Sequence, residues 1–80
     1  MVKGQIVCSK AGSDKNDFSV ITEVGEETVY ICDGKRHKLQ NPKKKNIKHI
    51  APTEEILSTE CISTDKALRK ALAVYRSKML

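Results

Sequence analysis

The sequence predicts a small, mainly β domain that ends in an α-helix. Short segments rich in β-branched residues recur about every eight to twelve residues over residues 5–50. Tight-turn residues separate these segments, and an apolar stripe with helical spacing follows over residues 68–79. Because about five short strands with tight turns are too few for a wide sheet, we expect a strongly bent barrel or sandwich.

The first three strands are expected where β-branched and aromatic residues concentrate. These segments are residues 5–10, 18–24 and 28–32. The polar loop between the first two contains Gly12 and Asn16, the residues there that most readily adopt a positive φ. In the second segment Phe18, Val20 and Val24 share one face, and Ile21 breaks the alternation. The third segment is apolar on both faces, so we expect both to be covered.

A tight hairpin is expected at Asp33-Gly34, which separates the third strand from residues 35–39. A one-to-one register across this turn places Tyr30 opposite His37 and Ile31 opposite Arg36. After a further turn signal at Asn41-Pro42, residues 46–50 are expected to form the last strand.

The composition changes after Pro52, where the sequence predicts helical structure. Residues 53–57 resemble a short capped helical turn, and Ser63 or Thr64 is placed to cap a longer helix. The apolar positions of that helix form one stripe. They are Leu68, Ala71, Leu72, Tyr75 and Met79. We therefore expect a barrel over residues 1–52 and a helical extension over residues 53–80 that packs on it within one domain.

The positive charge of the chain is concentrated in residues 33–50, called here the basic segment. It contains seven Lys or Arg residues and one acidic residue, a net charge of +6, whereas the whole chain carries +5. One interpretation is a solvated surface that only keeps the protein soluble. The charge is dense, however, and it lies among residues that predict strands and turns, so it favours a nucleic-acid footprint. Lys10 and Lys15 extend this footprint if the first loop converges on it.

Catalytic and metal-binding patterns are missing from the sequence. No Cys-His, Ser-His or paired-carboxylate arrangement has a suggestive spacing, so we expect neither an enzyme nor a cofactor. Cys8, Cys32 and Cys61, together with His37 and His49, match no common metal-site spacing. The chain also lacks a membrane-length apolar run and a signal-peptide core, so we expect a cytoplasmic protein.

Most of the chain before the helical extension resembles a known family. Residues 2–7, 9–12, 14–15 and 18–21 are similar to a KOW motif, in which a strand, a loop with one key glycine and a second strand follow one another. Residues 33–36, 41–46 and 48–50 resemble, more narrowly, small bacterial KOW-domain RNA-binding proteins related to an archaeal and eukaryotic large-subunit ribosomal protein. This resemblance covers about residues 2–52. It implies an SH3-like barrel with Gly12 as the key loop glycine.

The resemblance and the charge together predict an RNA-binding protein on or near the ribosome. Its partner is expected to be ribosomal RNA, with ribosomal proteins as further neighbours. Contacts should go mainly to phosphate and ribose of structured RNA, since the few aromatic residues are better explained as core. The candidate RNA-binding residues are Lys10, Lys15, Lys35, Arg36, His37, Lys38, Lys43, Lys44, Lys45, Lys48 and His49. The alternative is a protein-interaction module that docks an acidic partner in a transcription or translation complex.

Overall fold

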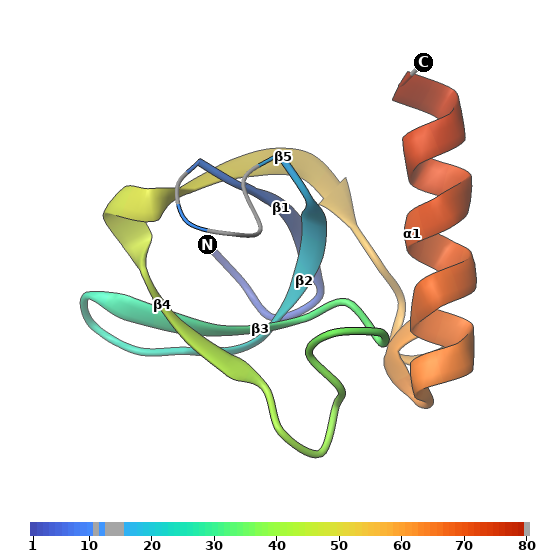
Figure 1. The fold of residues 1–80 in the computed structure, drawn as a ribbon, viewed down its shortest axis with the longest axis horizontal. Helices are drawn as coiled ribbons and strands as arrows, with labels where there is room; N and C mark the ends of the chain where they lie inside the picture. Colours follow the sequence, from blue (N-terminus) through green and yellow to red (C-terminus); the bar gives the residue numbers. More distant parts are fainter. Residues whose placement is uncertain (11, 13–15, 80) are drawn as a thin grey trace.

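Five antiparallel strands form one sheet in the computed structural model, which describes residues 1–10, 12 and 16–79. They are β1 (Gln5–Ser9), β2 (Phe18–Val24), β3 (Thr28–Cys32), β4 (Lys43–Asn46) and β5 (Ile50–Ile56). The strand order is β4-β3-β2-β1-β5. The two edge strands are therefore neighbours along the chain, joined by the short 3-10 helix η1 (Ile47–His49). Figure 1 shows how the sheet curls to allow this connection. The expected mainly β fold, with about five strands and a C-terminal helix, is confirmed.

The first three strands lie close to their predicted positions. β2 and β3 match, and β1 ends one residue earlier. A register shift between Ile21 and Glu23 marks a bulge at Thr22. Because directly opposed residues share a face, the pairs Ile21 with Ile31 and Val24 with Val29 place both β2 residues on one face. The predicted grouping of Val24 with Phe18 and Val20 is therefore wrong.

The expected hairpin at Asp33-Gly34 is also wrong, because residues 33–42 form a compact loop. The Asp33 carboxylate accepts the backbone N–H groups of Lys35 and His37, each at 2.9 Å. The carbonyl of His37 accepts the N–H groups of Asp33 and Gly34 at 2.9 and 3.1 Å. A short acidic side chain that bonds the following backbone competes with strand pairing.

β3 pairs with β4, and not with residues 35–39 as the sequence predicts. Tyr30 is opposite Lys44, and Ile31 is opposite Lys43. The predicted pairs of Tyr30 with His37 and Ile31 with Arg36 are therefore not formed.

The chain between β4 and β5 turns through η1, where residues 46–50 were expected to be one strand. The Asn46 side chain caps this turn by accepting the Lys48 N–H at 2.9 Å. β5 then continues through Pro52 to Ile56, so the expected helical turn at residues 53–57 is wrong. The Thr53 hydroxyl donates to the Ile6 carbonyl at 2.7 Å, which ties this segment to β1. Pairing with a distant strand thus overrides the local helix signal.

The helix α1 (Asp65–Met79) begins where the sequence predicts. The Thr64 hydroxyl accepts the Ala67 N–H at 3.1 Å, as an N-cap residue does. Leu68 and Leu72 are buried, whereas Met79 at the end of the predicted stripe is 62% exposed. Figure 1 shows α1 standing beside the sheet, with its C-terminal end projecting away from the loop between β3 and β4.

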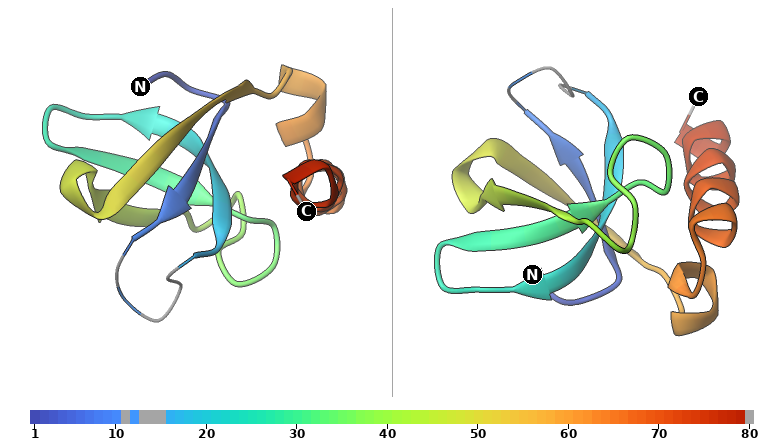
Figure 2. Two further views of the ribbon diagram at one scale, coloured as in Figure 1. Left: turned by 90° about the horizontal axis from the view of Figure 1, so that it is seen from above. Right: turned by 60° about the horizontal axis from the view of Figure 1, so that its bottom comes forward.

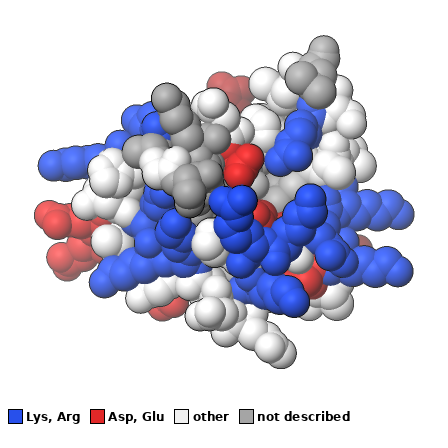
Figure 3. All heavy atoms as spheres, in the orientation of Figure 1, with Lys and Arg blue, Asp and Glu red and all other residues white. Residues whose placement is uncertain are grey.

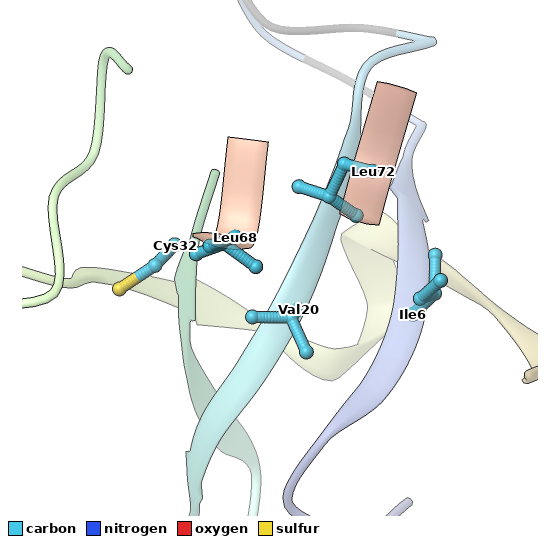
Figure 4. Close-up of a cluster of buried hydrophobic side chains, with 5 residues drawn as sticks. All are labelled: Ile6, Val20, Cys32, Leu68 and Leu72. Carbon is cyan, nitrogen blue, oxygen red and sulfur yellow. The ribbon is translucent and has the colours of Figure 1, made fainter. Parts of the chain in front are cut away.

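Two apolar clusters fill the two faces of the sheet. The inner cluster consists of Val7, Ile21, Val29, Ile31 and Ile50, with Ile47 against it. The outer cluster contains Ile6, Val20 and Cys32 from the strands and Leu68 and Leu72 from α1. Figure 4 shows the two leucines reaching from α1 toward these strand side chains. The prediction that the helix packs back on the sheet is confirmed.

The three cysteines are free thiols. Burial raises the pKa of the Cys32 thiol from 9.0 to about 11. A hydrogen bond with Thr22 acts in the opposite direction and lowers this pKa, while the charges of Asp65 and Asp33 raise it by smaller amounts. Burial, followed by the charge of Asp17, also raises the pKa of the Cys8 thiol. Cys32 therefore behaves as a small core residue.

Among the residues that the structure describes, no helix has the length and apolar character needed to cross a membrane.

Leu68 should be among the residues that contribute most to stability. Leu68→Ala removes a fully buried side chain from the outer cluster and should lower the free energy of unfolding by about 2–5 kcal/mol. Val74→Ala on the same helix removes a side chain that is 50% exposed, and should change it by less than about 0.5 kcal/mol. Urea denaturation measures both. Equal losses in the two variants would contradict the docking of α1 described here.

The raised pKa of Cys32 predicts a loss of stability at alkaline pH. The folded state holds the thiol proton more tightly, so the contribution is fully present below pH 9 and is lost as the pH rises from 9 toward 11. Unfolding free energies of the wild type and Cys32→Ala, measured from pH 8 to 11, should converge with rising pH. Parallel curves for the two proteins over this pH range would mean that Cys32 has no raised pKa.

Candidate nucleic-acid interface

The basic segment is mostly at the surface, but its cations are not equivalent. The exposed members are Lys35, Arg36, Lys38, Lys44, Lys48 and His49. His37 and Lys43 are half-buried, and Lys45 is only 8% exposed. The segment therefore offers a set of exposed cations on folded backbone, together with one lysine whose side chain belongs partly to the interior.

The alternation of β4 explains why Lys45 is buried. Lys43 and Lys45 lie opposite Ile31 and Val29, two members of the inner cluster, and so share their face of the sheet. Lys44 lies opposite Tyr30 on the other face. The methylene stem of a lysine can cover apolar surface while its ammonium group reaches water. The three consecutive lysines are thus divided between two faces.

The loop after β1 meets the basic segment at η1. The Lys10 N–H donates to the His49 carbonyl at 2.8 Å, which places these two residues side by side. Gly12 and Asn16 in this loop have φ values of +90° and +72°, as the sequence predicts. Lys15 lies outside the described residues, so only Lys10 is placed beside the basic segment.

Acidic residues border this surface. The Ile47 N–H donates to the Glu27 carbonyl at 3.0 Å, so the turn between β2 and β3 with Glu26 and Glu27 lies against η1. Figure 3 shows Lys and Arg side chains gathered over the lower half of one face, with Asp and Glu side chains at its left margin and a few between the cations. The face is predominantly, but not purely, cationic.

The loop of residues 33–42 approaches the side of α1 (Figure 2). A groove lies at this approach. We call it the α1 groove; its volume is about 370 Å³. It is lined by Asp17, Phe18, Asp33, Lys35, Arg36, Arg69, Leu72, Ala73 and Arg76. Four of these residues are cations and two are carboxylates, while Phe18, Leu72 and Ala73 are apolar.

Sequence reasoning places Lys35 and Arg36 in the candidate interface but misses Arg69 and Arg76. The two arginines are seven residues apart, which puts them on one helix face, with Ala73 between them. That spacing is visible in the sequence. What the sequence does not show is that this face turns toward the loop after β3.

Gly34 sets the distance between the loop and α1. Its φ is +79°, and a Cβ atom there would lie 2.5 Å from the Asp65 carbonyl oxygen and 2.9 Å from Arg69 Cγ. The Asp65 carboxylate accepts the Leu39 N–H at 2.8 Å, which holds the far end of the same loop. Lys35 and Arg36 are therefore positioned relative to Arg69 by backbone contacts on both sides.

In comparisons with known proteins, no protein-family model matches this chain and no curated protein is significantly similar to it.

Gly34→Ala should lower the free energy of unfolding by more than the cost of an alanine at positive φ alone. An L-residue at positive φ costs about 1–2 kcal/mol, and the close approach to Asp65 and Arg69 adds to this cost. Gly12→Ala is the matched control, because Gly12 is exposed and has a φ of +90°. Urea denaturation should show the larger loss for Gly34→Ala. Equal losses would mean that the loop does not rest on α1.

Proposed function

We propose that this protein binds structured RNA, with the basic segment as the centre of its interface. The observation that carries the proposal is a net charge of +6 within residues 33–50, held on folded backbone and joined by Lys10 at η1. Closely spaced cations on a rigid scaffold repel one another, and a phosphate backbone relieves that repulsion while releasing its own counterions.

The contacts of this interface should go mainly to phosphate and ribose. Phe18 and Tyr75 pack edge to face, with ring centroids 5.2 Å apart, and Tyr30 is half-buried. Because these rings take part in packing, they form no open platform for a run of several stacked bases. The exposed lysines instead provide mobile ammonium groups that suit phosphate oxygens.

The resemblance to KOW proteins supports a place on or near the ribosome in the cytoplasm. Five antiparallel strands in one curled sheet are what an SH3-like barrel of the KOW type would have. Gly12, which corresponds to the key loop glycine, has a φ of +90° that favours glycine. In this proposal ribosomal RNA is the ligand, and the protein has no catalytic role.

Salt dependence and charge removal test the proposal together. Affinity for a ribosomal RNA fragment should fall steeply between about 50 and 200 mM salt, because cations are released on binding. In a triple variant, Lys35→Ala, Lys44→Ala and Lys48→Ala, the log-log salt slope should shrink by about one for each lost phosphate contact. Fluorescence anisotropy titrations measure both. Lys45 is left unchanged because its side chain is buried.

The control is a second triple variant, Lys66→Ala, Lys70→Ala and Lys78→Ala, which removes the same charge from exposed positions on α1. It should keep most of the affinity and of the salt slope. A flat salt titration of the wild type, or equal losses in the two triple variants, would contradict the proposal. Binding of an acidic protein partner without any RNA binding would support the interaction-module alternative.

A further inference from the structure

We infer that the α1 groove holds one unpaired nucleotide of the bound RNA, so that the protein prefers RNA with a bulged or looped base over a continuous duplex. This inference rests on the proposed function but concerns a different surface from β4 and η1. Its basis is the combination of four cations, three apolar residues and two carboxylates around one groove. None of the three features alone would indicate a nucleotide.

The walls of the α1 groove suit a chain of phosphates. Arg69 and Arg76 are two turns apart on α1, about 10 Å along its axis, and both are exposed. Lys35 and Arg36 stand on the opposite wall, on the loop that Gly34 holds against the helix. A guanidinium group can donate two parallel hydrogen bonds to a phosphate. An RNA strand that crosses the groove therefore meets cations on both sides.

The apolar part of the lining of the α1 groove is not what a phosphate site needs. Phe18, Leu72 and Ala73 are apolar, and the edge-to-face contact with Tyr75 fixes the Phe18 ring. An apolar surface between cations suits the face of a base whose phosphates are held at the rim. The groove volume of about 370 Å³ lies within the range of about 300–1,000 Å³ that is usual for small-ligand sites.

The two carboxylates indicate which bases fit. Asp33 already accepts two backbone N–H groups through one of its oxygens, so its role is chiefly structural. Asp17 lines the groove at the start of β2, beside Phe18. A carboxylate accepts hydrogen bonds from amino groups and repels a carbonyl oxygen at the same position. The groove should therefore favour a base with an exocyclic amino group over uracil.

A base inside a continuous duplex cannot reach this site. Its edge is paired and its faces are stacked, and side chains cannot read the narrow major groove of an RNA helix. A bulged nucleotide is already unstacked and costs little to insert. The preference for unpaired nucleotides thus follows from placing a base, and not only phosphates, against the groove residues, whereas the cations of β4 and η1 would bind paired and unpaired RNA alike.

The test compares two RNA hairpins that differ only by one bulged adenosine. At fixed salt, the wild type should bind the bulged hairpin about tenfold more tightly, which is the scale of one base contact. The double variant Arg69→Ala and Arg76→Ala should bind the two hairpins with similar affinity. The control double variant, Lys66→Ala and Lys70→Ala, removes the same charge from the same helix outside the groove. It should keep the preference for the bulged hairpin.

The results separate this inference from the proposed function. If the wild type binds both hairpins equally with a steep salt dependence, or if the two double variants behave alike, the nucleotide site is wrong and RNA binding stands. If the wild type binds neither hairpin, the proposed function fails as well.

A second comparison tests the role of Asp17. Replacing the bulged adenosine by uridine should reduce wild-type affinity several-fold, because the amino group is lost. The asparagine amide in Asp17→Asn has both a hydrogen-bond donor and an acceptor. This variant should therefore bind the hairpins with bulged adenosine and bulged uridine with similar affinity. Unchanged discrimination in Asp17→Asn would show that another group reads the base.

Discussion

The interaction on which the rest of the structure depends is the packing of Leu68 and Leu72 against the outer face of the sheet. The outer face of the curled sheet carries the apolar side chains of Ile6, Val20 and Cys32, and α1 covers them. The same contact fixes the rotation of the helix about its axis. With Leu68 and Leu72 turned inward, Arg69 and Arg76 must flank the buried stripe and lie beside the loop after β3. Hydrophobic docking thus decides where the helix charges are placed.

The loop after β3 is held at both of its ends by acidic residues. Asp33 folds the first half on itself, and Asp65 at the start of α1 accepts the Leu39 N–H from the second half. Gly34 allows the backbone to approach the helix between these points. An anchored loop keeps Lys35 and Arg36 near the helix despite their mutual repulsion, because the carboxylates offset part of the positive charge. The acidic residues in this surface therefore organise it.

The sequence predicts those elements whose signals are local. Alternation and turn residues locate β2 and β3, and the Thr64 cap locates the start of α1. The signals fail where a distant partner decides the structure. Residues 53–56 carry an N-terminal helix pattern, yet they pair with β1, which is more than forty residues away. Asp33-Gly34 carries a hairpin pattern, yet the Asp33 side chain bonds the backbone that would have formed the returning strand.

The candidate site follows the same division between local and distant signals. The density of lysine in residues 33–50 is a property of the sequence, whereas the burial of Lys45 follows from pairing with Val29. The α1 groove needs three segments that are far apart in the chain, so no local pattern reveals it. Its cations and those of β4 also differ in their surroundings. Lys44 on β4 is exposed to water, whereas Arg69 and Arg76 lie beside the apolar residues that line the α1 groove. Under the proposed RNA-binding function, we therefore expect selectivity among RNAs to come from the groove, where cations and apolar residues lie together, and affinity common to all RNAs to come from the strand.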